Sequence, residues 1–262
     1  MTQRIALGIA YDGSRYHGWQ HQEEVSSVQQ MVEHAVSRVA NHPVSIVCAG
    51  RTDSGVHATA QVVHFDSDAE RTEHAWVFGA NSNLPGDISV LWAQTMPGDF
   101  HARFSAVSRT YRYLICNQPV RPGIFHKAVS WNYKNLDVER MQSATHYLLG
   151  EHDFSAFRGS GCQAPHAVRT VQSLSVTRRG QLVMIEITAN AFLLHMVRNI
   201  AGVLSLIGTG EKEPKWARDV LLSQDRRHGG MTSAPNGLYL VDVGYPPELN
   251  LPKLPKGPFF LS

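Results

Sequence analysis

The stretch Val44-Ser45-Ile46-Val47-Cys48-Ala49-Gly50-Arg51-Thr52-Asp53-Ser54-Gly55-Val56-His57-Ala58 joins two segments that have the pattern of β-strands. Residues 44–48 form a mostly apolar run, typical of a short buried strand, which ends at Gly50. Residues 59–65 resume a strand pattern. In an extended backbone, side chains two positions apart point the same way. The sequence therefore predicts two strands whose connecting loop presents Arg51 and Asp53 on one face.

Working outward from this loop, the first hundred residues alternate between strand and helix patterns. Ser27 and Gln30 form a capping box, and apolar residues recur at helical spacing up to Asn41. The predicted elements are a strand at 4–11, a helix at 28–39, strands at 44–48 and 59–65, a helix at 73–81 and a strand at 88–93. The order strand, helix, strand, strand, helix, strand predicts a ferredoxin-like unit.

The second half repeats this order. The predicted elements are a strand at 109–116, a helix capped by Asp137, a hairpin at 171–176 and 182–188, a strongly amphipathic helix at 193–207, a short helix after Pro214 and a strand at 238–243. We therefore expect an α/β (α+β) fold of two pseudo-symmetric ferredoxin-like, RRM-like halves. They would share a mostly antiparallel central sheet, with helices on one face and an active-site cleft between the halves.

The expected domains are residues 1–103, which carry the Asp53 loop, residues 104–246, and an extended proline-rich tail at 247–262. A hydrophobic share of 43% and a charged share of 18% indicate a soluble globular protein. No signal-like segment and no apolar run of bilayer length is present, so we expect a cytoplasmic protein that does not bind membranes.

The composition gives little support to metal or nucleotide cofactors. The three cysteines are far apart and lack Cys-x-x-Cys spacing, the 14 histidines show no His-Glu-x-x-His pattern, and no glycine-rich phosphate loop is present. We expect no cofactor and no metal. The net charge of +2 does not by itself indicate a nucleic-acid partner. Arginine outnumbers lysine by 18 to 6, which suits an RNA groove of local arginine clusters but also follows from codon usage.

Several blocks, in one order along the chain, resemble a known family. Arg51-Thr52-Asp53-Ser54-Gly55-Val56-His57-Ala58 is similar to the signature of the TruA-type pseudouridine synthases, which act on the anticodon arm of tRNA. The other similar blocks are Tyr11-Asp12-Gly13 to Gln20, Phe104-Ser105 to Tyr113, Gly150-Glu151-His152-Asp153-Phe154 to Arg158, Phe192 to Asn199, and Gly237 to Val243. The resemblance spans nearly the whole chain.

The resemblance implies an isomerase that converts uridine to pseudouridine in the anticodon stem-loop of tRNA, working as a homodimer without a cofactor. It implies that Asp53 is the nucleophile and that Arg198 holds it ionised through an ion pair. It places Tyr111 against the target uracil, as a stacking surface and candidate proton acceptor, and gives Arg51 a part in flipping the base. Five further arginines are candidate contacts to the RNA backbone: Arg15, Arg103, Arg109, Arg158 and Arg169.

Other interpretations of the same residues stay open. An Asp two residues before a Gly is typical of an Asx turn, an Arg on a helix is usually solvated, and a strand Tyr usually covers a sheet. Asp53-Ser54-Gly55 also occurs in aspartic proteases, but their paired carboxylates favour apolar neighbours and no second copy is present. A non-catalytic RNA-binding module on an RRM-like sheet is a further alternative.

Two departures from the family pattern stand out. Asn236 occupies a position where His is expected before Gly237, and Leu194 replaces a frequent aromatic or His. The first leaves the role of that His in doubt.

Overall fold

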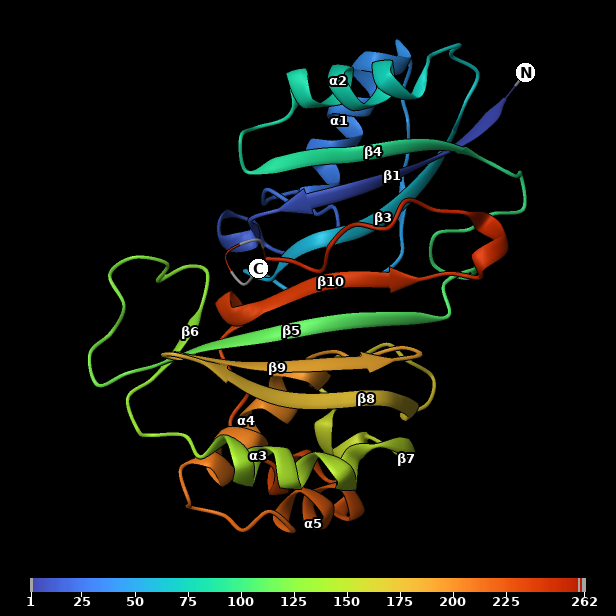
Figure 1. Ribbon diagram of the computed structural model, residues 1–262. Coiled ribbons are helices and arrows are strands. Elements are labelled where there is room, and N and C mark those ends of the chain that lie inside the picture. The colour runs from blue at the N-terminus through green and yellow to red at the C-terminus, as the bar shows by residue number, and fades with distance from the viewer. Residues whose placement is uncertain (1, 259, 261–262) are drawn as a thin grey trace. The chain divides into compact units, whose positions relative to one another are not determined.

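The computed structural model describes residues 2–258 and 260, which divide into two compact units. The first unit comprises the described residues of Met1–Arg109 and Tyr239–Ser262, and the second comprises Thr110–Leu238. Each unit combines helices with a mostly antiparallel sheet, as the sequence predicts (Figure 1). The predicted domain boundaries at residues 103 and 246 stay predictions.

The first unit has the ferredoxin-like strand order. Its elements are β1 (Gln3–Tyr11), α1 (Val28–Ala40), β2 (Val47–Cys48), β3 (His57–Ser67), α2 (Glu73–Asn83), β4 (Ile88–Met96) and most of β10 (Leu238–Gly244). The strands lie in the order β4, β1, β3, β2, with antiparallel neighbours. Strand β10 joins the start of β3 in parallel, with Tyr239 opposite His57. This pairing brings β10 beside the strand that follows the Asp53 loop.

Local sequence signals set the helix ends and the core of the first unit. The side chain of Ser27 accepts a hydrogen bond from the amide of Gln30, which confirms the predicted cap of α1. Asn41, in the left-handed region at φ 61°, ends the same helix. The ring of Phe65 on β3 lies 5.1 Å from that of Trp76 on α2, so the helical layer packs against this face of β3. Figure 1 shows α1 and α2 side by side.

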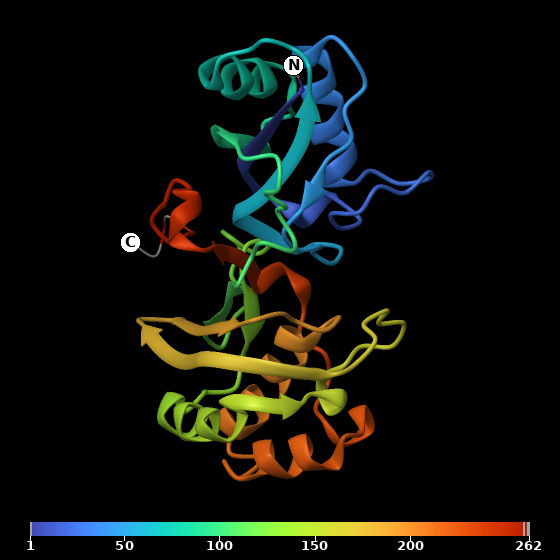
Figure 2. The same cartoon turned by 90° about the vertical axis from the view of Figure 1, so that its right-hand side faces the viewer.

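The second unit is built around a long hairpin. Its elements are β5 (Ser108–Asn117, from Thr110 onward), β6 (Ser130–Asn132), α3 (Val138–Thr145), β7 (Gly150–Asp153), β8 (Val168–Arg179), β9 (Leu182–Ala189), α4 (Met196–Gly208) and α5 (Trp216–Ser223). The strands lie in the order β5, β9, β8, β7, and β6 pairs in parallel with β5. The predicted hairpin is β8 and β9. The side chain of Asp137 caps α3, as expected. Figure 2 shows the segment between β7 and β8 looping out from this unit.

The structure corrects two element boundaries. The predicted strand at 44–48 is reduced to Val47–Cys48, because the amide of Val44 donates to the hydroxyl of Ser37 and that of Ile46 donates to Glu33. These amides bind side chains of α1 and not a neighbouring strand. The helix predicted from residue 193 begins at Met196, since His195 has a φ of 61°.

Candidate functional site

The loop that carries Asp53 is a tight turn between β2 and β3. The amide of Val56 donates to the backbone carbonyl of Asp53 over 3.1 Å, and Gly55 adopts a φ of 77°, which glycine accepts without strain. The side chain of Asp53 is half-buried, whereas Arg51 is exposed. The turn therefore holds the backbone of Asp53 while its carboxylate stays within reach of solvent.

A second loop, between β1 and α1, fixes the Asp53 loop from one side. The amide of Trp19 donates to the carbonyl of Thr52 over 3.0 Å. The carbonyl of Tyr16 accepts from the amide of Gly55 at 3.2 Å and from the hydroxyl of Ser54 at 3.3 Å. Backbone groups on both sides of Asp53 are thus bound to one neighbouring loop.

The close approach of these loops depends on Gly18. It has a φ of 91°, and a Cβ at this position would lie 2.8 Å from the carbonyl oxygen of Thr52 and 3.2 Å from the carbonyl carbon of Asp53. Both the backbone conformation and the available space exclude a side chain. Gly18 is one of the residues of the 11–20 block, and this contact gives a physical reason for a glycine there.

Buried side chains hold the base of the loop. The hydroxyl groups of Tyr11 and Thr52 lie 2.8 Å apart in the interior. Gln61, fully buried on β3, donates to the carbonyl of Gly50 at 2.6 Å and accepts from its amide at 3.4 Å. Because polar groups that are buried must be paired, these bonds fix the direction in which the loop leaves β2.

Arg109, one of the predicted RNA contacts, is buried in this scaffold. Its guanidinium donates to the carbonyl of Ala49 through Nε and Nη2, at 3.3 and 2.9 Å, and to the carbonyls of Ala106 and Arg103, at 3.2 and 2.7 Å. The residue is 8% exposed. Arg109 therefore ties the strand that leads to Asp53 to the 103–106 segment, and its contact with RNA stays a prediction.

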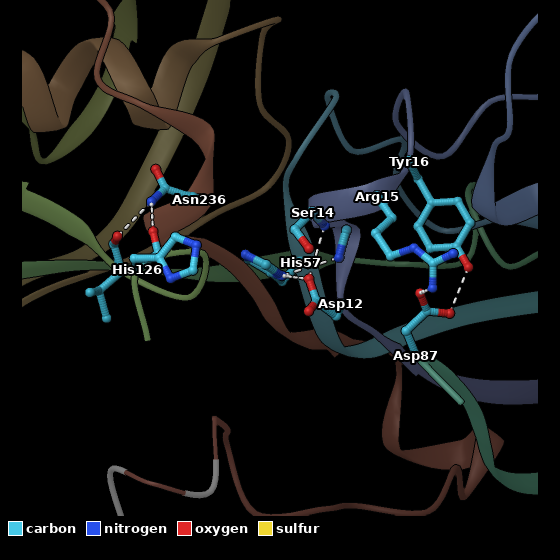
Figure 3. Close-up of polar contacts among 10 residues, drawn as sticks. Asp12, Ser14, Arg15, Tyr16, His57, Asp87, His126 and Asn236 are labelled. Atoms are coloured by element: carbon cyan, nitrogen blue, oxygen red, sulfur yellow. Dashed lines mark hydrogen bonds and ion pairs between the residues drawn. The ribbon is translucent and has the colours of Figure 1, made fainter. Parts of the chain in front are cut away.

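Asp12 and His57 form a polar pair beside the loop (Figure 3). Nδ1 of His57 lies 3.1 Å from Oδ1 of Asp12 and 3.1 Å from the amide nitrogen of Gly13. A deprotonated Nδ1 accepts from Gly13, whereas a protonated Nδ1 donates to Asp12. The hydrogen bond to His57 holds the pKa of the Asp12 carboxyl well below its usual range. The imidazole is 3% exposed and stacks on Tyr239 at 4.6 Å, which fixes its orientation.

Arg15 and Tyr16 meet at Asp87 (Figure 3). The hydroxyl of Tyr16 donates to Asp87 at 2.7 Å, and the guanidinium of Arg15 lies 3.3 Å from the same carboxylate. Burial, followed by the bond to Asp87, raises the pKa of Tyr16. Arg15 is 74% exposed, so its guanidinium is open to solvent, and its contact with RNA stays a prediction.

Tyr111 and Arg198 lie in the second unit. Tyr111 on β5 is buried and packs edge-on against Phe192, with ring centroids 5.0 Å apart. Nε of Arg198, in the first turns of α4, donates to the carbonyl of Ser233 at 2.8 Å, and the amide of Ser233 donates back to the carbonyl of Arg198 at 3.2 Å. Asp53 belongs to the first unit, so its pairing with Arg198 stays a prediction.

The remaining predicted arginines of the second unit bind local carbonyls. Arg158 donates to the carbonyls of Cys162 and Ala164, at 2.6 and 2.7 Å. Nη1 of Arg169 donates to the carbonyl of Val168 at 2.5 Å, and Nε is buried without a partner among the described residues. Both arginines thereby shape the segment between β7 and β8, and their role toward RNA stays a prediction.

The structure gives Asn236 a defined role in the second unit. Its amide nitrogen donates to the carbonyl of His126 at 2.9 Å and to that of Val129 at 2.6 Å (Figure 3). Asn236 therefore closes the long connection between β5 and β6. Asn236 therefore has a structural role, although it departs from the family pattern at this position.

The sequence alone gives no role to Gly18, Gln61, Asp12 or His57. Gly18, Asp12 and His57 do lie inside the family-like blocks, which is a signal for them, whereas nothing in the sequence indicates Gln61. Within residues 2–258 and 260, no group of three or more His, Cys, Asp or Glu side chains could hold a metal ion. No helix in that part of the chain is both long and apolar enough to cross a membrane.

Comparison with known proteins places these features in a family. Residues 8–105 and 144–246 match the family described as tRNA pseudouridine synthase. The chain is 62% identical to tRNA pseudouridine synthase A of Coxiella burnetii, over 98% of this chain and 99% of the relative. It is 55% identical to the Pseudomonas aeruginosa protein of that name, over 100% of this chain and 92% of the relative. The Vibrio cholerae protein is also 55% identical, over 98% of each.

Among solved structures, the crystal structure of a Cbf5-Nop10-Gar1 complex contains a chain that aligns with a TM-score of 0.36 at 12% identity. The alignment covers 90% of this chain and 49% of that chain.

Proposed function

Because the chain belongs to the tRNA pseudouridine synthase family, we propose that it converts uridines on the 3′ side of the tRNA anticodon stem-loop to pseudouridine, with Asp53 as the nucleophile. The reaction breaks the bond between N1 of uracil and C1′ of ribose and forms a bond from C5 to C1′. C5 loses a proton and N1 gains one. The enzyme therefore has to supply a nucleophile, a surface that retains the detached base, and a proton acceptor.

The position of Asp53 carries this proposal. Thr52, Ser54 and Gly55 bond to one adjacent loop, and the carbonyl of Asp53 itself closes the turn. A nucleophile attached to a backbone fixed in this way pays little ordering cost when substrate arrives. A turn needed only for chain reversal would not require residues before and after Asp53 to bond to the same neighbouring loop.

Arg198 is proposed as the cation that keeps Asp53 ionised once the site closes. A cation within hydrogen-bonding reach lowers the pKa of an Asp by about 1–3 units and offsets the rise that burial causes. Support comes from the hydrogen bond that Nε of Arg198 donates to the carbonyl of Ser233, which orients the guanidinium on the first turns of α4.

Tyr111 is proposed to stack on the target base, and Arg51 is proposed to displace it from its stack. Tyr111 already packs edge-on against Phe192, so its ring is held in one orientation before a uracil arrives. Aromatic stacking retains a base with about 1–3 kcal/mol. The guanidinium of Arg51 is exposed and makes no hydrogen bond or ion pair with any described residue, so it is available to displace a base from its stack.

We further propose that the protein works as a cytoplasmic homodimer without cofactor and that Arg15, Arg103, Arg109, Arg158 and Arg169 contribute to tRNA binding. These proposals follow from the resemblance to the family. For Arg15, the exposed guanidinium also supports a role in tRNA binding.

The test is to incubate purified protein with unmodified tRNA transcripts and to map pseudouridine at single-nucleotide resolution. The wild type is expected to modify the 3′ side of the anticodon arm, and Asp53→Asn, which keeps the size of the side chain, is expected to modify none. Asp68→Asn is the matched control, because Asp68 is 76% exposed. Wild-type protein that binds tRNA without converting uridine would favour the binding-module alternative, and modification elsewhere would refute the anticodon-arm assignment.

A further inference from the structure

An exposed aromatic ring stands on a rigid turn of the first unit, which Arg109 links to the strand that leads into the Asp53 loop. Phe104 is 76% exposed, although burial of its ring would be favourable. The imidazole of His101 lies 4.3 Å from its ring centroid at an interplanar angle of 31°. The guanidinium carbon of Arg103 lies 5.4 Å from the same centroid. We call residues 101–105 the aromatic turn.

Hydrogen bonds inside the aromatic turn fix its shape. Nδ1 of His101 accepts from the amides of Arg103 and Phe104, at 3.1 and 3.2 Å. The amide of His101 donates to the hydroxyl of Ser105 at 3.0 Å, and the amide of Ser105 donates to the carbonyl of His101 at 2.9 Å. Because Nδ1 acts as an acceptor, the imidazole is neutral in this arrangement.

Further bonds attach the aromatic turn to the sheet of the first unit. The amide of Ala102 donates to Nδ1 of His64 at 3.1 Å, and its carbonyl accepts from the hydroxyl of Tyr245 at 2.6 Å. The carbonyl of Arg103 accepts from Arg109, whose guanidinium also binds Ala49. One buried arginine thus bonds directly to both the aromatic turn and the strand that leads to Asp53.

Arg51 of the Asp53 loop and Arg103 of the aromatic turn both act on the thiol of Cys48. Burial raises the pKa of the Cys48 thiol to about 11, and the positive charges of Arg51 and Arg103 act in the opposite direction. Both guanidinium groups thus act electrostatically on the same thiol. The Arg103 guanidinium makes no hydrogen bond or ion pair with any other residue that the structure describes. It is available for a phosphate.

From this geometry we propose that His101, Arg103 and Phe104 form a stacking platform for an unpaired nucleotide of the tRNA substrate. The inference rests on the proposed function. A base stacks on the open face of Phe104, and Arg103 binds an adjacent phosphate. Proteins read single-stranded RNA in this way, through aromatic rings flanked by cations. The rigidity of the turn favours this use, because a ring held in place loses little entropy when a base stacks on it.

A matched control is available in the same unit. Phe78 on α2 is 60% exposed and also stacks on a histidine, with the ring of His74 at 4.1 Å. No cation lies over Phe78 among the described residues. Phe78→Ala therefore removes an exposed, histidine-supported phenylalanine without touching the platform.

The experiment measures the dissociation constant of tRNA by filter binding at fixed salt, and then KM and kcat. Phe104→Ala is expected to weaken tRNA binding and raise KM roughly 5- to 100-fold, the general range for loss of one base–aromatic stack, with kcat nearly unchanged. Phe104→Trp should restore binding, and Phe78→Ala should match the wild type. Arg103→Gln should reduce the salt dependence of binding by about one phosphate contact. A blunt RNA duplex should bind wild type and Phe104→Ala equally.

Unchanged tRNA affinity in Phe104→Ala or Arg103→Gln would overturn the platform. So would a loss of affinity in Phe104→Ala that accompanies a change of oligomeric state in sedimentation, because the ring would then contact another protein chain. Filter binding does not require catalysis, so the two proposals fail separately. If the wild type forms no pseudouridine but Phe104→Ala still weakens tRNA binding, the proposed function fails and the platform stands.

Discussion

The guanidinium of Arg109 binds the carbonyl oxygen of Ala49 through two nitrogen atoms, Nη2 at 2.9 Å and Nε at 3.3 Å. Ala49 lies four residues before Asp53, directly after β2. The same guanidinium also donates to the carbonyls of Arg103 and Ala106. This buried cation therefore links the strand that leads to Asp53 with the 103–106 segment and fixes the geometry of both.

Arg109→Lys is expected to lower the free energy of unfolding by about 2 kcal/mol, because an ammonium cannot reproduce the planar fork and leaves buried carbonyls unpaired. Urea unfolding followed by circular dichroism measures this. Arg218→Lys on the exposed face of α5 is the control and should change nothing. Equal stability of the two variants would show that Arg109 does not hold these segments together.

Gly18→Ala is expected to displace the Asp53 loop. The left-handed backbone costs an alanine about 1–2 kcal/mol, and its Cβ would collide with the carbonyl of Thr52. We expect turnover to fall roughly 10- to 100-fold, since small shifts of a nucleophile have effects of this size. Gly86→Ala is the matched control, because a Cβ there meets nothing within 4 Å. Wild-type turnover in Gly18→Ala would mean that the loop tolerates the shift.

Acid should loosen the aromatic turn through His64. The pKa of His64 is lowered to about 4, first by burial and then by its neighbours His101 and Arg4, while Asp66 acts in the opposite sense. An unfolded histidine titrates near pH 6.5. The unfolded state therefore takes up this proton first as the pH falls.

The stability that neutral His64 contributes is complete above about pH 6.5 and is lost as the pH falls toward 4, with a slope of at most about 1.4 kcal/mol per pH unit. His64→Gln should flatten this part of the stability profile, whereas the exposed His74→Gln should leave it unchanged. Chemical denaturation at intervals between pH 7 and 4 provides the measurement. An identical slope in His64→Gln and wild type would assign the loss to other groups.

Arg198→Ala is expected to reduce turnover roughly 100-fold or more while tRNA affinity stays nearly intact, because the charge acts on the nucleophile and not on the RNA backbone. Filter binding and single-turnover kinetics separate the two effects, and Arg218→Ala controls for loss of surface charge. Thermal unfolding checks that loss of the bond to Ser233 has not unfolded the protein. Normal turnover in a folded Arg198→Ala variant would refute the proposed ion pair.

Tyr111→Phe separates stacking from proton transfer. The ring and its contact with Phe192 are kept, so KM should stay within about twofold, while loss of a proton acceptor should lower kcat by roughly 100-fold. Tyr111→Ala should impair both. Wild-type kcat in the Phe variant would limit Tyr111 to stacking, and full activity in the Ala variant would remove it from the site.

The sequence was most informative where local chemistry determines structure. The cap of α1 by Ser27, the cap of α3 by Asp137 and the β8–β9 hairpin all follow from neighbouring residues, and all are present. Predictions failed where distant groups compete. Val44 and Ile46 have strand-like side chains, but their amides find partners on α1. Likewise His195 delays the start of α4 by adopting a left-handed backbone.

By itself, the sequence determined the order of the elements, the ferredoxin-like pattern and, through its blocks, the family. These depend on periodicity and on short motifs, which are local. Only the tertiary structure revealed that Gly18, Gln61 and Arg109 hold the Asp53 loop, from 35 residues before to 56 residues after that side chain in the sequence. Contacts across such separations arise when the chain packs, because a buried carbonyl bonds to whichever donor the fold brings within reach.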